Sequence, residues 1–183
     1  MPKYLTTTRI SLAAGTALLA LAASALPALA TPGDLYVSNH DNNTIERFTP
    51  GGVASVFAST GLNGPTGLAF DASGNLYAAI LFAGIIERFT PGGTASVFAS
   101  TGLSNPNGLA FDASGNLYAS NLVNDTIERF TPGGTASVFA NAGLSPPYGP
   151  AFDAIGNLYV PNDDNTIKRF TPGGVASVFA STG

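Results

Sequence analysis

From residue 31 onward, short apolar runs alternate with polar turn sequences at a regular interval. In one such unit, residues 67–101, the variable loop after the second run is the only long connection. Elsewhere Asp and Gly, or Pro and Gly, provide the geometry of tight turns. The pattern predicts short antiparallel strands, and no helical period accompanies it. The expected strands are 67–70, 76–78, 86–89 and 94–99.

The unit is repeated along the chain. Residues 70–77 recur 41 residues later as 111–118 and again as 152–159, and Arg-Phe-Thr-Pro-Gly-Gly occurs four times. Four short strands in about 40 residues are typical of a β-propeller blade, with a solenoid as the alternative. One blade cannot bury both faces of its sheet, so neighbouring blades must stack. The predicted repeats are 31–62, 63–103, 104–144 and 145–183.

Two stretches of the repeat resemble the NHL family. They are the run Pro-x-Gly-Leu-Ala-Phe-Asp-x-x-Gly-Asn-Leu-Tyr, and residues 42–48 following Leu35-Tyr36-Val37. The resemblance covers nearly all of residues 31–183. It implies an all-β propeller of NHL-type four-stranded antiparallel blades, most often six in a closed ring. Members of this family include scaffolds, sensor domains and a few enzymes, so the fold does not fix the function.

The first repeat begins at its second strand, with Gly33-Asp34-Leu35-Tyr36, and so lacks its innermost strand. Three explanations remain open. The chain is a fragment of a longer, six-bladed propeller, or it assembles with a second copy through unpaired blade edges, or it forms an incomplete four-bladed disc. Exposed strand edges would invite pairing with another chain in the last two cases.

The first 30 residues differ from the rest. Lys3 and Arg9 precede an uncharged Ala/Leu-rich run at 10–26, and Ala28-Leu29-Ala30 follows. This is the layout of a secretory signal peptide, here 1–30, with an uncleaved anchor as the alternative. We expect a secreted, periplasmic or cell-surface protein that makes no membrane contact after cleavage.

Charge and cysteine content restrict the function classes. Residues 31–183 hold five basic and eleven acidic residues, and no cysteine occurs in the chain. An acidic surface without a basic cluster argues against nucleic acid and anionic lipid as partners. The lack of cysteine excludes disulfides, thiol chemistry and cysteine metal sites.

The positions at which the repeats differ are the candidates for binding. One such set lies just before the innermost strand, where a propeller faces its central channel: Thr66, Asn107 and Tyr148. Their hydroxyl and amide groups suit a ligand, although they can also simply end the connecting loop. The segment around Asn107 resembles gluconolactonase-like propellers, in which such an Asn helps to hold a divalent cation. The acidic partners are not recognisable, so we predict no metal site.

The loop between the second and third strands is the other variable set. Asn and Asp gather there at 39–43, 121–125 and 162–165, which suits either Ca²⁺ or turn formation, and we favour turns. The second repeat instead carries Ile80, Leu81 and Phe82. An exposed apolar loop marks a partner site, whereas a covered one is only core.

Few residues suggest catalysis. His40 is the one histidine, and the Glu beside each Arg (Glu46, Glu87, Glu128) suggests surface ion pairs. We therefore predict no catalytic residue and no cofactor. The leading hypothesis is an exported binding or scaffolding module for a protein, peptide or glycan. The alternative is a Ca²⁺- or Mg²⁺-assisted lyase or lactonase at the channel mouth, related to streptogramin-cleaving propellers.

Overall fold

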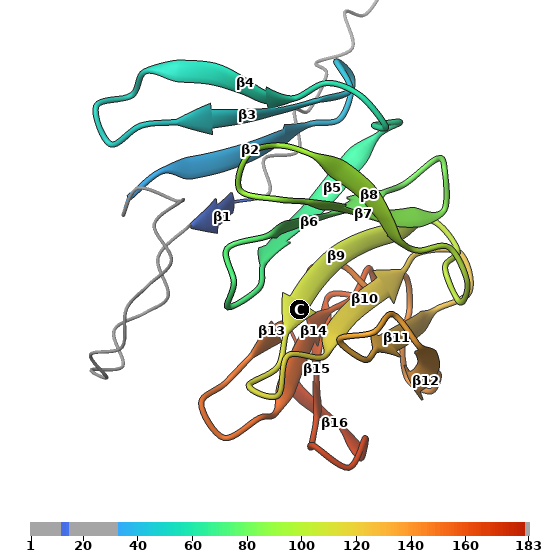
Figure 1. Cartoon of the computed structure of the whole chain (residues 1–183). Helices are drawn as coiled ribbons and strands as arrows, with labels where there is room; N and C mark the ends of the chain where they lie inside the picture. Colours follow the sequence, from blue (N-terminus) through green and yellow to red (C-terminus); the bar gives the residue numbers. More distant parts are fainter. Residues whose placement is uncertain (1–11, 15–32, 182–183) are drawn as a thin grey trace, which may run out of the picture.

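The computed structural model describes residues 12–14 and 33–181, and in this part of the chain every regular element is a strand. Four four-stranded antiparallel sheets follow one another as blades, from blade 1 (blue-green) to blade 4 (red) in Figure 1. Blade 1 consists of β1 (Leu12–Ala14), β2 (Leu35–Asn39), β3 (Thr44–Phe48) and β4 (Ala54–Ala58); blade 2 of β5 (Pro65–Phe70), β6 (Leu76–Ile80), β7 (Ile85–Phe89) and β8 (Ala95–Ala99); blade 3 of β9 (Pro106–Phe111), β10 (Leu117–Asn121), β11 (Thr126–Phe130) and β12 (Ala136–Ala140); and blade 4 of β13 (Ala151–Phe152), β14 (Leu158–Pro161), β15 (Thr166–Phe170) and β16 (Ala176–Ser181).

The hairpin between the first two strands of a blade is built around one aspartate. In blade 3, Asp112 Oδ1 accepts hydrogen bonds from the backbone N–H groups of Ser114, at 2.9 Å, and Asn116, at 2.8 Å. Its Oδ2 accepts from the Asn116 side-chain amide at 2.8 Å, and Gly115 takes the left-handed conformation with φ 79°. Asp71 and Asp153 repeat the arrangement. The predicted turn is confirmed, because the aspartate satisfies donors that the turn would otherwise leave unpaired.

Neighbouring blades are joined by aromatic rings. Between blades 1 and 2, the ring of Tyr36 meets Phe57 and Phe70 edge-on, each with 5.0 Å between ring centroids. Phe57 also contacts Phe89, which is fully buried. Tyr36 and Phe57 belong to the first blade of the joint, and Phe70 and Phe89 to the second. The next two joints repeat the set with Tyr77, Phe98, Phe111 and Phe130, and then with Tyr118, Phe139, Phe152 and Phe170.

A β-bulge in the outermost strand places one of these rings. In blade 1, Ile45 pairs with Ala58 but Glu46 pairs with Val56, so Phe57 is an extra residue on β4. The bulge directs the Phe57 ring toward the joint while Val56 stays 60% exposed. The same register shift recurs in all four blades.

The first repeat has no innermost strand of its own, as predicted, and a strand from outside the repeat lies in that position. Residues 12–14 form β1, which pairs antiparallel with β2 in the register Leu12 to Val37 and Ala14 to Leu35. The rest of the predicted signal peptide lies outside the described residues. No helix in the described part of the chain is long and apolar enough to cross a membrane.

The innermost strand of blade 4 is shorter than expected. Only Ala151 and Phe152 pair with β14, whereas β9 pairs with β10 at Pro106 and again from Leu109 to Phe111. Pro150 stands where Leu109 stands one repeat earlier, and its missing N–H cannot donate to the ladder. An isolated bridge from Pro147 to Asn162 preserves the start of the strand.

The expected surface Glu–Arg pairs are wrong: within the described residues none of Glu46, Glu87 and Glu128 forms an ion pair, and Arg47 pairs with Asp34. Glu87 and Glu128 are only 6% and 5% exposed. A methyl group added at Gly61 would lie 3.3 Å from Glu87 Oε1, so this carboxylate packs under the linker between blades 1 and 2. Burial raises the pKa of both glutamates above 4.5, because a desolvated carboxylate is easier to protonate.

This burial predicts a pH-dependent stability. Because the folded-state pKa is raised, the folded protein binds protons more tightly, and stability falls as the pH rises from about 4.5 through that pKa. We expect the substitutions Glu87→Gln and Glu128→Gln together to raise the Tm by a few degrees at pH 7 and to change it little at pH 4. Thermal unfolding across this pH range measures the difference. Glu46→Gln, at the same position on the half-buried face of blade 1, is the control. An equal gain at both pH values would contradict the assignment.

Candidate functional site

The two variable sets of the sequence lie together at one end of the blades. The loop between the second and third strands bonds through its backbone to the linker that enters the innermost strand. Leu81 N donates to Gly64 O at 2.9 Å, and Leu122 N donates to Asn105 O at 3.2 Å. In blade 4, Asp163 N donates to Ser145 O at 2.9 Å. We call the surface formed by these loops and linkers the loop face.

Thr66 is built into the axis of the propeller. Its side chain is 6% exposed, and its hydroxyl lies 3.2 Å from Pro106 O and 3.3 Å from Ala79 O. The Ser38 hydroxyl donates to Thr66 O at 2.6 Å. Residues 38, 66 and 106 belong to three successive blades. The Thr66 hydroxyl, which we predicted as a ligand-binding group, therefore joins the innermost strand of blade 2 to that of blade 3.

Asn107 and Tyr148 differ from Thr66 and from each other. Asn107 is 9% exposed, and its side-chain amide forms no hydrogen bond within the described residues. Tyr148 is half-buried and donates from its hydroxyl to Asp163 Oδ1 at 3.0 Å, which turns it toward the loop of its own blade. The structure thus joins Thr66 to Pro106, the residue before Asn107, and directs the Tyr148 hydroxyl to Asp163. Their role in ligand binding stays a prediction.

The innermost strands approach one another so closely that only glycine fits in the Pro-x-Gly sequence. A Cβ on Gly67 would lie 2.8 Å from Gly108 Cα, and one on Gly108 would lie 2.6 Å from Pro150 Cδ and against Gly149 Cα. These neighbours are backbone or ring atoms that cannot swing aside. Nothing lies within 4 Å of a Cβ on Gly149, the last of the three glycines. The glycine of the motif is therefore a requirement of blade packing.

The apolar loop of blade 2 is divided between core and surface. Ile80 is fully buried in the joint with blade 1, and Leu81 is half-buried. Phe82 is 61% exposed, and its ring lies edge-on to His40 of blade 1, with 5.2 Å between centroids. His40 in turn contacts Asp41 Oδ1 at 2.9 Å. Of the three residues predicted for this loop, Phe82 is the one presented to solvent.

Asn and Asp in the other three loops form turns. Asn43, Asp125 and Asn165 have positive φ, at 54°, 51° and 60°, which these residue types tolerate better than most. The Thr166 hydroxyl donates to Asp164 Oδ1 at 2.5 Å, and this bond lowers the pKa of the carboxyl group. The favoured turn role is confirmed. Within 12–14 and 33–181, no three His, Asp or Glu side chains gather as a metal site would need.

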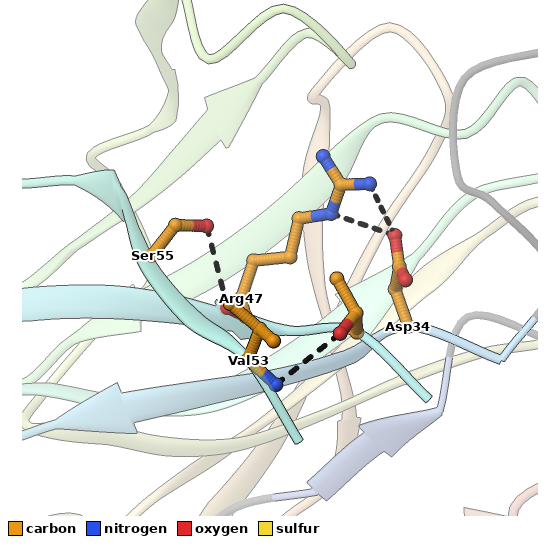
Figure 2. Close-up of polar contacts among 5 residues, drawn as sticks. Asp34, Arg47, Val53 and Ser55 are labelled. Carbon is orange, nitrogen blue, oxygen red and sulfur yellow. Dashed lines mark hydrogen bonds and ion pairs between the residues drawn. The ribbon is translucent and has the colours of Figure 1, made fainter. Parts of the chain in front are cut away.

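Asp34 marks a difference between repeats that the sequence reasoning missed. Asn75 holds the matching position in blade 2 and bonds to Asp71, whereas the first repeat has Ala30 in the sequence at the position of that aspartate. Asp34 is 1% exposed, and both Nε and Nη2 of Arg47 lie 2.6 Å from its Oδ2, as Figure 2 shows. In blade 1, Arg47 therefore binds the side chain at this position, whereas in blade 2 the turn aspartate Asp71 does so. The sequence did carry a signal for this difference, because Asp34 stands where the other three repeats have Asn75, Asn116 and Asn157.

Comparison with known proteins supports the fold. No family model matches the chain, and no curated protein does. Among solved structures, a chain of the nidogen/laminin complex is 26% identical with a TM-score of 0.74, covering 81% of this chain and 60% of that one. A virginiamycin B lyase from Staphylococcus aureus is 19% identical with a TM-score of 0.70, covering 80% of this chain and 52% of its own. A putative gluconolactonase is 21% identical with a TM-score of 0.69, covering 81% and 59%.

These structures are β-propellers, and the chain has the same all-β architecture of four-stranded blades. The chain spans between 52% and 60% of their length. The finer NHL assignment is not established by the comparisons and stays a prediction.

The axial glycines provide a direct test of blade packing. Gly108→Ala should cost about 1–3 kcal/mol, because the added methyl group meets backbone that cannot move without separating blades 3 and 4. Gly149→Ala, at the same place in the next repeat, should leave stability unchanged or slightly higher. Urea unfolding of both variants measures the difference. Equal stabilities would show that the innermost strands are farther apart than described.

Proposed function

We propose that this chain is an exported, non-catalytic binding or scaffolding module whose loop face receives a protein, peptide or glycan outside the cytoplasm. The observation that carries the proposal is the contrast between the repeated core and the loops. The joints between blades use the same residues each time, whereas the loop face changes chemistry from blade to blade. Such variation is what a binding surface on a rigid scaffold requires.

The middle of the loop face is apolar. Phe82 of blade 2 and Val123 of blade 3 are 61% and 65% exposed. Acidic side chains flank them, with Asp41 in blade 1 and Asp163 and Asp164 in blade 4. Large exposed apolar side chains with a polar rim are typical of sites at which partners dock. The chemistry favours a partner with an apolar anchor and neighbouring positive charge.

Two further points support the proposal. One of the similar structures is a chain of the nidogen/laminin complex, and this likeness supports a binding role for the propeller. The Lys/Arg-then-apolar pattern of residues 1–30, with its Ala-x-Ala sequence, supports export and a location at the cell surface, in the periplasm or in the medium. Cleavage after Ala30 would remove β1 and leave the edge of β2 in blade 1 unpaired.

The test is a selection of displayed peptides and a glycan array against the purified chain. We expect binders whose affinity falls at least about tenfold in a Phe82→Ser/Val123→Ser variant, because apolar anchors dominate such interfaces. The matched control is Val97→Ser/Val138→Ser, which removes equally exposed side chains from β8 and β12.

Equal loss of affinity in both variants would contradict a role for the loop face. A saturable thermal shift with Mg²⁺ or Ca²⁺, together with turnover of a lactone or a streptogramin B, would instead favour the lyase or lactonase alternative.

A further inference from the structure

The outer face of blade 4 is half of a blade joint with no partner in the described chain. Tyr159 and Phe179 meet edge-on, with 4.8 Å between centroids, as Tyr36 and Phe57 do in blade 1. Phe179 is 58% exposed, whereas the three equivalent phenylalanines are half-buried. Ile167 shares this face and is half-buried, although its three equivalents are fully buried. We call Tyr159, Ile167 and Phe179 the donor face.

Blade 1 carries the other half of the joint. Leu35 and Phe48 pair across β2 and β3 and are half-buried, whereas their equivalents in blade 2, Leu76 and Phe89, are fully buried by blade 1. Strand alternation places Leu35 and Phe48 on the side of the sheet opposite Tyr36 and Ile45, which pack against blade 2. We call Leu35 and Phe48 the acceptor face.

We propose that the donor face of one chain docks on the acceptor face of a second copy, so that the chain associates head to tail. The argument is continuity with the joints inside the chain. At each of the three internal joints, a Tyr–Phe pair of one blade packs against a Leu and two Phe of the next. Blade 1 carries the Leu of this set and the Phe of the third strand. The chain exposes that same Tyr–Phe pair at one end and that same Leu–Phe pair at the other.

The charges on the two faces are compatible. Arg169 lies opposite Tyr159 on the donor face, as Arg88 lies opposite Tyr77 on the face of blade 2 that meets blade 3. Glu46 lies opposite Val37 on the acceptor face, at the position of the buried Glu87. The new joint would therefore bring together the same charges as the internal ones and no like-charge pair. An interface between two different faces is heterologous, and it leads to a ring when the rotation closes or to an open chain when it does not.

The test is the mass of the full chain by light scattering and sedimentation velocity. The wild-type protein should self-associate as its concentration rises. Phe179→Glu, which blocks the donor face, should be monomeric, and Phe48→Glu, which blocks the acceptor face, should be monomeric as well. A 1:1 mixture of the two should form dimers and nothing larger, because each partner retains one working face. Val178→Glu, 57% exposed on the same strand, is the control and should associate as the wild type does.

A second measurement keeps the test valid if a charged variant fails to fold. The chain has no cysteine, so cysteines introduced singly at 179 and 48 are the only thiols in the mixture. A short bismaleimide should link position 179 of one copy to position 48 of the other. A monomeric wild type at all concentrations would overturn the proposal, as would links only between identical positions. In that case the donor and acceptor faces would not be an interface between two copies of this chain.

Discussion

Each blade depends on the face it shares with its neighbour, because four strands of about five residues cannot enclose a core of their own. The Tyr–Phe pair of one blade closes over a Leu and two Phe of the next, and edge-on aromatic contacts add about 0.5–1.5 kcal/mol per pair beyond the area they bury. Removing one ring, such as Phe130, would leave a cavity between two sheets, which no single sheet can close. Stability is therefore a property of pairs of blades and rises with each joint.

The same packing explains where variation is tolerated. Near the axis, Gly67 and Gly108 allow the innermost strands to touch, and Thr66 uses its hydroxyl on the backbone of the next blade. At the periphery, the bulge at Phe57 fixes the outermost strand. The loops between the second and third strands have only to form a turn with one left-handed residue, which Asn43, Gly84, Asp125 and Asn165 all provide. The remaining loop positions are free to carry different chemistry, and Phe82 is the clearest example.

Much of this architecture could be predicted from sequence, because each strand ends in a turn whose chemistry is local. The Asp71–Asn75 and Thr90–Gly93 turns needed only their own residues to be recognised. Long-range effects could not be predicted in this way. The burial of Glu87 depends on a linker 26 residues earlier in the chain, and the burial of Ile80 depends on which face of β6 meets blade 1. Among the candidate site residues, Thr66 looked available because the sequence does not show that Pro106 O lies beside its hydroxyl.

The identity of the joints has a consequence for how a gene of this kind can change. Since every joint is formed by the same residue types 40 or 41 positions apart, a crossover between two misaligned copies would insert or delete one whole blade and leave each remaining joint intact. The residues that form a joint are the same whatever the number of blades before or after it. Blade number in such a lineage is therefore set by recombination and by selection on the assembled ring, and stepwise point mutation is not needed to change it.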